Sequence, residues 1–220
     1  MLNSLGQLLL KLTSPGIPDT YQGNEIWRFC LVDPDNRRSV DYVRRTEMLA
    51  SLQRLMENDA VPMASRLREL LDNASDGRVK MYVMWRSLIL RREQPEVFLH
   101  GAYLPLDVAG PAKEHLCAFA RIHGEHVVVA AVPRLTATLL RKDASRWPLD
   151  REVWQETAVV LPQRFKKYRF VDRLSGEVVE AGPGQGGRLL AADLFRSLPV
   201  ALLVGRGKRV RRSGSPGAPG

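Results

Sequence analysis

The chain has 220 residues, of which 45% are hydrophobic and 26% are charged, and its formal net charge is +9 at pH 7. This composition is typical of a soluble globular protein and excludes an intrinsically disordered chain. No apolar run reaches the ~20 residues that cross a bilayer, and the first residues lack the pattern of a signal peptide, so we expect a cytoplasmic protein without a membrane segment.

The first predicted elements are a helix and a short strand. Residues 1–11 place leucines at helical spacing, which predicts an amphipathic helix. The apolar step at residues 16–21, closed by Gly23, predicts a buried strand. Pro18 cannot donate to a ladder, so this strand should be short, irregular or close to a sheet boundary. Helix, strand and helix form the repeating unit of an α/β barrel, and we expect the chain to hold one such unit.

A polar loop follows the predicted strand. Its residues 33–38 read Asp-Pro-Asp-Asn-Arg-Arg, and Asp35 and Asn36 tolerate the backbone angles of the turn that Pro34 fixes. Carboxylates, an amide and guanidinium groups on one loop suit a ligand rich in hydroxyl groups. Tyr21 and Trp27 add flat apolar faces, which is the usual composition of a small-molecule pocket. The alternative is a solvated turn whose charges pair locally.

Three more helices are predicted before residue 99. Residues 39–58 form an amphipathic helix that Ser39 can cap, and Pro62 begins a shorter helix. Residues 79–92 form a third helix, which Pro95 ends. The apolar residues Met81, Met84 and Trp85 of this helix are interpreted as core packing.

From residue 101 the hydrophobic period changes to two, which predicts short strands and an antiparallel, two-layer β-sandwich. The turn at residues 123–125 is typical of a tight hairpin. The predicted strands are residues 103–108, 115–122, 126–132, 157–161, 168–172, 177–180, 188–191 and 200–204.

The basic charge is concentrated at the end of the chain. Residues 205–220 are rich in glycine, serine and proline and cannot bury a core, so we expect a flexible basic tail rather than a nucleic-acid arm. Five of the nine net positive charges come from this tail, which leaves +4 for the remaining residues. The five residues are Arg206, Lys208, Arg209, Arg211 and Arg212.

Other chemistries have little support in the sequence. Cys30 and Cys117 lie far apart in apolar surroundings, which favours reduced thiols over a disulfide. The four histidines lack partners at the spacing of a metal site, and the glycine-rich residues 182–187 lack the features of a phosphate-binding loop. We therefore expect neither a metal nor a cofactor.

One stretch resembles a known family. Residues 12–25, Leu-Thr-Ser-Pro-Gly-Ile-Pro-Asp-Thr-Tyr-Gln-Gly-Asn-Glu, resemble the segment around the last barrel strand of the α-amylase family of glycosidases. Followed by Leu-Val-Asp-Pro-Asp-Asn-Arg-Arg at residues 31–38, they resemble in particular its maltooligosyltrehalose synthases. Further matches follow in the same order, so that the resemblance covers roughly residues 3–204 and is more specific than its single pieces. These matches lie at residues 76–80, 85–86, 90–93, 101–106, 132–135 and 198–203.

The resemblance implies an α+β, multidomain fragment. Residues 1–98 would be the last helix–strand–helix part of a (β/α)8 barrel with extra helices, residues 99–204 an antiparallel β-sandwich, and residues 205–220 the tail. The family's nucleophilic aspartate, acid/base glutamate and stabilising aspartate lie on earlier strands, upstream of the matching segment. We therefore expect no catalytic residue here and a fragment that is inactive alone.

The implied activity converts the reducing-end α-1,4 linkage of a maltooligosaccharide into an α,α-1,1 linkage, as in trehalose biosynthesis. We expect eight residues to build the rim of the sugar pocket: Tyr21, Gln22, Glu25, Asp33, Asp35, Asn36, Arg37 and Arg38.

The expected partners are the maltooligosaccharide and the upstream barrel segment. Because an orphan barrel strand leaves apolar surface and an unpaired edge, we also expect either a homodimer or a rearrangement near residues 16–21. No nucleic acid or membrane is expected. An alternative is a carbohydrate-binding or structural β-domain, and a basic nucleic-acid binder is the third reading. Exposed aromatic residues on the β-domain would support the carbohydrate-binding alternative, and the candidates are Tyr103, Trp147, Trp154 and Tyr168.

Overall fold

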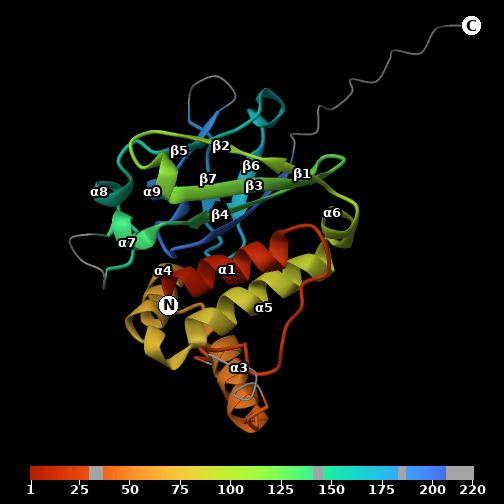
Figure 1. Ribbon diagram of the computed structural model, residues 1–220, viewed down its shortest axis with the longest axis vertical. Helices are drawn as coiled ribbons and strands as arrows, with labels where there is room; N and C mark the ends of the chain where they lie inside the picture. The colour runs from red at the N-terminus through yellow and green to blue at the C-terminus, as the bar shows by residue number, and fades with distance from the viewer. Residues whose placement is uncertain (30–36, 141–145, 183–186, 207–220) are drawn as a thin grey trace, which may run out of the picture.

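The computed structural model describes residues 1–29, 37–140, 146–182 and 187–206. Helices make up most of the first half of the chain, and two antiparallel sheets make up most of the second half (Figure 1). In these residues no helix is long and apolar enough to cross a bilayer. The tail predicted at residues 205–220 begins too early, because Gly205 and Arg206 belong to a strand, and residues 207–220 lie outside the described residues.

The predicted helices are present, with differences at their ends. Asp41, rather than Ser39, caps α3, because its carboxylate accepts a hydrogen bond from the backbone N–H of Arg44 at 2.8 Å. Pro62 is the N-cap residue of α4, and Pro95 both follows α5 and begins the short helix α6. The helices of this half are α1 Leu2–Thr13, α3 Tyr42–Glu57, α4 Met63–Asp72, η1 Ala74–Asp76, α5 Arg78–Glu93 and α6 Pro95–Leu99.

The larger sheet has six strands in the order β1-β3-β4-β9-β6-β7, and the smaller has three in the order β2-β5-β8. Their bounds are β1 Ala102–Pro105, β2 Asp107–Ala109, β3 Leu116–His123, β4 His126–Pro133, β5 Ala158–Val160, β6 Arg169–Asp172, β7 Val178–Val179, β8 Arg188–Leu190 and β9 Ala201–Arg206. Short helical turns connect them: η2 Lys113–His115, α7 Thr136–Leu139, α8 Arg151–Trp154, η3 Gln163–Phe165 and α9 Ala191–Leu194.

Each predicted strand from residue 103 onward corresponds to an observed one, except that residues 103–108 are divided between two strands. The chain leaves the larger sheet after β1 and enters the smaller sheet with β2, and Leu106 at the crossing is buried. The predicted hairpin between β3 and β4 is confirmed, since His123 pairs with His126 and Gly124 has a φ of 57°.

Strand β4 has side chains in the apolar layers on both faces of the larger sheet. Val127 and Val129 lie in a cluster with residues of the smaller sheet, whereas Val128 and Val132 lie in a cluster with the helices. The fold therefore has a helix layer, the six-stranded sheet and the three-stranded sheet in succession. In the helix layer α1 and α5 run side by side beneath the larger sheet, and α3 lies farther from it (Figure 1).

The predicted strand at residues 16–21 is wrong. This segment is an irregular connection after α1, and Ile17 within it is 90% exposed. A strand needs a neighbour with which to exchange hydrogen bonds, and no described strand lies in register with this segment. Pro18 removes one donor, and the φ of 104° at Gly16 turns the backbone away from the extended region.

A buried carboxylate joins the larger sheet to the helix layer. Asp172 on β6 is 4% exposed, and its Oδ1 accepts from the backbone N–H groups of Leu174 and Leu202 at 3.0 and 3.2 Å. Its Oδ2 accepts from the Ser175 hydroxyl at 3.1 Å. Tyr82 of α5 donates to the carbonyl of Leu174, so the same turn also contacts a helix. Burial disfavours the charged carboxylate more than these hydrogen bonds favour it, and the net effect raises the pKa of Asp172 to about 6.

We predict that Asp172 makes the free energy of unfolding fall with rising pH. The folded state keeps the proton of this carboxyl up to about pH 6, whereas the unfolded state releases it near pH ~4. The contribution of the protonated carboxyl to the free energy of unfolding is therefore complete below pH ~4. It decreases between pH ~4 and about pH 6, by at most about 1.4 kcal/mol per pH unit. Asp172→Asn keeps an acceptor for the two backbone N–H groups and removes the titration.

Urea unfolding of both proteins between pH 4 and pH 7 checks this prediction. The stability of the native chain relative to Asp172→Asn should decrease across that range. A difference that stays constant with pH would show that Asp172 does not titrate in this window.

Candidate functional site

The site is built around the connection from α1 to α3, which we call the 14–29 loop. Two arginines fix its start by donating to carbonyl groups at the C-terminal end of α1. Arg91 of α5 donates to the carbonyl of Leu12 at 2.8 Å, and Arg121 of β3 donates to that of Thr13 at 3.2 Å. These carbonyls have no partner within the helix and carry its partial negative charge, so guanidinium groups stabilise them.

Arg121 also links this point to the sheet. It is 2% exposed, and one nitrogen of its guanidinium donates to the carbonyls of Phe98 and Gly101 at 3.0 and 2.9 Å. A single buried side chain thus holds the end of α1, the end of α6 and the start of β1 at fixed positions relative to β3. Burial lowers the pKa of Arg121.

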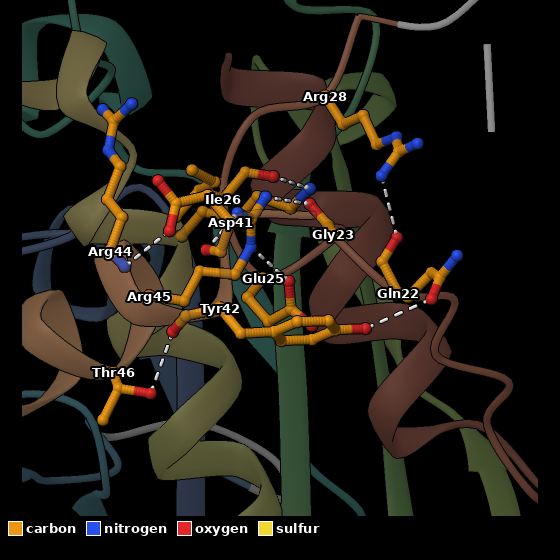
Figure 2. A network of polar contacts seen from close by, with 11 residues as sticks. Gln22, Gly23, Glu25, Ile26, Arg28, Asp41, Tyr42, Arg44, Arg45 and Thr46 are labelled. Atoms are coloured by element: carbon orange, nitrogen blue, oxygen red, sulfur yellow. Dashed lines mark hydrogen bonds and ion pairs between the residues drawn. The ribbon is translucent and has the colours of Figure 1, made fainter. Parts of the chain in front are cut away.

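The far half of the loop is held by the first turn of α3 (Figure 2). Arg45 donates from Nε to the Glu25 carboxylate at 2.9 Å and, through its other nitrogens, to the carbonyls of Gly23 and Asp41 at 3.2 and 3.0 Å. Tyr42 donates its hydroxyl to the side-chain oxygen of Gln22 at 3.1 Å. The planar guanidinium reaches three acceptors at once, which an ammonium group could not do in this geometry.

Helix α5 also contacts the 14–29 loop, through the side chain of Lys80. Lys80 is buried and donates to the carbonyl of Ile26 at 3.0 Å, and its ammonium lies 5.8 Å from the centre of the Trp27 ring. Trp27 donates its indole N–H to the carbonyl of Ala74. Gly77 permits this close approach, because a Cβ there would lie 2.8 Å from that of Ile26.

An apolar hollow of about 400 Å³ lies between the 14–29 loop, α3 and α5. Its polar wall comes from Thr20, Glu25, Tyr42, Arg45 and Thr46, and its apolar wall from Leu49, Met81, Met84, Trp85 and Leu88. Apolar surface with a few converging polar groups is the usual make-up of a ligand pocket. Met81 and Met84 are buried, in agreement with their prediction as core residues, while Trp85 and Leu88 are partly exposed.

The structure brings together some of the predicted pocket residues. Gln22 and Glu25 both belong to the network around α3, whereas Tyr21 is exposed with no hydrogen bond to that network. Arg37 and Arg38 are exposed, and each takes part in an interaction with another group. Asp33, Asp35 and Asn36 lie outside the described residues. The role of all eight as a sugar-pocket rim stays a prediction.

Sequence reasoning missed Tyr42, Arg45 and Lys80. A signal for the first two was present, because residues in the first turn of a helix lie close to the loop that leads into it. Lys80 gave no such signal, since it is 54 positions from the carbonyl that it contacts. In the described parts of the chain, no group of three or more His, Cys, Asp or Glu side chains could hold a metal ion.

Most of the aromatic residues that could form a sugar-binding face of the β-domain are buried or partly buried. Trp154 is fully buried and donates to the carbonyl of Pro148 at 2.7 Å, so it is not accessible. Tyr103 is exposed and packs on Phe119 with ring centres 4.8 Å apart. Trp147 and Tyr168 are partly buried.

We predict that Arg45→Met loosens the 14–29 loop. The substitution keeps most of the apolar stem but removes all three hydrogen bonds, and should lower the stability by about 1 kcal/mol because the pair with Glu25 is partly exposed to solvent. Trypsin should then cleave faster after Arg28. Arg44→Met is the matched control, since Arg44 is exposed on the same turn and only its backbone takes part in the network. Equal cleavage rates in the two variants would contradict this role for Arg45.

The chain is similar in sequence to known proteins. No family model matches the chain. A protein of Mycobacterium tuberculosis, named "Putative maltooligosyl trehalose synthase" in strains H37Rv and CDC 1551, is 36% identical over 204 residues, which are 92% of this chain and 20% of the relative.

Solved structures agree with the sequence comparison. The maltooligosyltrehalose synthase from Arthrobacter ramosus is similar with a TM-score of 0.66 and 34% identity, over 93% of this chain and 22% of that protein. Another maltooligosyl trehalose synthase structure has a TM-score of 0.59 and 28% identity over the same shares of the two chains. The chain thus spans about a fifth of the length of these relatives. Over nearly its whole length, it is homologous to one segment of maltooligosyltrehalose synthase.

Proposed function

We propose that the chain is the supporting, C-terminal part of a maltooligosyltrehalose synthase and that the catalytic carboxylates lie elsewhere in that enzyme. The observation that carries this proposal is similarity to such synthases over more than nine-tenths of the chain but only about a fifth of theirs. The whole enzyme would convert the reducing-end α-1,4 linkage of a maltooligosaccharide into an α,α-1,1 linkage.

This chemistry makes a specific demand on the supporting part. A retaining mechanism uses two carboxyl groups about 5 Å apart, one as nucleophile and one as acid/base. The glucose released in the first step has to be held and turned so that its anomeric hydroxyl attacks the glycosyl-enzyme intermediate and displaces the enzyme carboxylate before water can do so. The enclosing wall must therefore exclude water and offer fixed hydrogen-bonding groups.

The 14–29 loop has the properties of such a wall. Glu25 is held in an ion pair with Arg45 at 2.9 Å, which suits an anchoring carboxylate better than a nucleophile that must be free to attack. Tyr42 and Thr20 place hydroxyl groups beside the apolar floor formed by Trp85 and Leu88. We assign the positioning of substrate hydroxyl groups to this loop, Tyr21 included, and to Arg37 and Arg38.

Exposed apolar side chains around the site favour a covering partner. Ile17, Phe29 and Val43 are 90%, 84% and 71% exposed, and Tyr42 and Leu88, which line the apolar hollow, are also exposed. Contiguous exposed apolar side chains on a globular protein are typical of an interaction surface. We propose that the upstream barrel segment covers it in the whole enzyme and that a second copy of the chain covers it when the chain is alone.

The test is a product assay with maltopentaose, carried out with this chain alone and with the chain mixed with a separately expressed upstream segment. We expect loss of reducing ends without release of glucose only in the mixture. The chain with Arg45→Met should show a lower ratio of isomerised product to released glucose, because a looser wall admits water.

Two results would contradict the proposal. Isomerisation by the chain alone would mean that carboxylates such as Asp19 and Glu25 perform the chemistry. A mixture that forms a complex but never isomerises would mean that the chain does not support this reaction.

A further inference from the structure

A second hollow also borders the 14–29 loop, and its lining shares no residue with that of the apolar hollow. It has a volume of about 250 Å³ and is lined by Ser4, Gln7, Leu8 and Lys11 of α1, Asn24 of the loop and Lys80 of α5. We call it the two-lysine hollow. Ser4, Gln7 and Lys11 share one face of α1 because they are spaced three and four residues apart.

Lys80 is the buried member of this group. It is only 8% exposed, and of the three N–H donors of its ammonium one is used, by the carbonyl of Ile26. Among the described residues this ammonium makes one further contact, with the Trp27 ring at 5.8 Å from its centre, but no second hydrogen bond and no ion pair. Burying an ammonium group with incomplete hydrogen bonding is unfavourable unless a further partner is supplied.

The electrostatics of the hollow point to the kind of partner. Burial lowers the pKa of Lys80, and the charge of Lys11 acts in the same direction, which means that the two ammonium groups repel each other. Glu25 opposes these effects, but its carboxylate is bound to Arg45 at 2.9 Å, and no acidic residue lines the hollow. Two convergent cations beside amide and hydroxyl donors match an anion with several oxygen atoms.

A neutral sugar fits this wall less well. Its hydroxyl groups both donate and accept, so they would leave the repulsion between Lys11 and Lys80 uncompensated. We propose that the two-lysine hollow binds an oxyanion, either a free phosphate-like ion or a carboxylate side chain from another part of the synthase. Its binding would connect α1, the 14–29 loop and α5 at one point.

The test is a titration of the 220-residue chain with inorganic phosphate at constant ionic strength, followed by the NMR signals of the Asn24 and Gln7 side-chain amides. We expect saturable shifts with a Kd on the order of 1 mM. Lys11→Gln should weaken binding about tenfold, which is about 1.4 kcal/mol. Lys113→Gln is the control, because this exposed lysine on η2 lies outside the hollow and should bind phosphate as the native chain does.

Lys80→Met should abolish the shifts. If this variant does not fold, Lys11→Gln against Lys113→Gln still decides the matter, since Lys11 is exposed and its loss should not affect folding. Shifts that never saturate, equal affinity in these two variants, or binding of glucose without binding of phosphate or acetate would each overturn the proposal.

The source of the oxyanion is distinguished by repeating the titration with the upstream segment bound. Phosphate that still binds supports a free ion as the ligand. Phosphate that is excluded while Lys11→Gln weakens the complex supports a carboxylate of the synthase. Exclusion with an unchanged affinity of Lys11→Gln for the upstream segment would contradict the carboxylate.

Discussion

Hydrogen bonds from buried or half-buried cationic side chains to backbone carbonyl groups hold the 14–29 loop in its conformation. Arg91 and Arg121 fix the end of α1, Arg45 fixes the loop at Gly23, and Lys80 fixes it at Ile26. A loop without strand partners has many carbonyls to satisfy, and leaving them buried and unbonded would be costly. Long cationic side chains solve this problem because they reach the loop from elements packed on different sides of it.

The layered fold places these side chains. Arg121 extends from β3 toward the helices, and Arg91 and Lys80 come from α5, which runs beside α1 under the larger sheet (Figure 1). The valines of β4 alternate between the two apolar clusters and keep the sheet fixed between them. The conformation of the 14–29 loop therefore depends on the larger sheet, although the loop forms no backbone pairing with a described strand.

The sequence was informative where structure depends on local pattern. Hydrophobic periodicity and turn residues predicted the main helices and nearly all strands, because burial on one face imposes a period along the chain. The strand predicted at residues 16–21 failed for a physical reason: the pattern was suitable, but a strand also requires a neighbour, which the described residues do not provide. The division of residues 103–108 between two sheets likewise depends on tertiary packing at Leu106.

The same limit applies to the site. Gln22 and Glu25 were predicted from the chemistry of their own stretch, but their partners Tyr42 and Arg45 lie 20 positions away, and Lys80 lies farther. Spacing along the chain carries no information about contacts over such separations. The resemblance to the synthases came from ordered short motifs rather than from any single one, and the sequence and structure comparisons bear it out.

Contacts within this chain, and not the rest of an enzyme, set the conformation of the 14–29 loop. A crystal structure of the 220-residue chain alone tests it most directly. We expect the guanidinium of Arg45 to donate to Glu25 and to the carbonyl of Gly23, and Lys80 to donate to the carbonyl of Ile26. We also expect residues 16–21 to form no strand. Residues 16–21 paired as a strand with a second copy, with Arg45 turned into solvent, would contradict it.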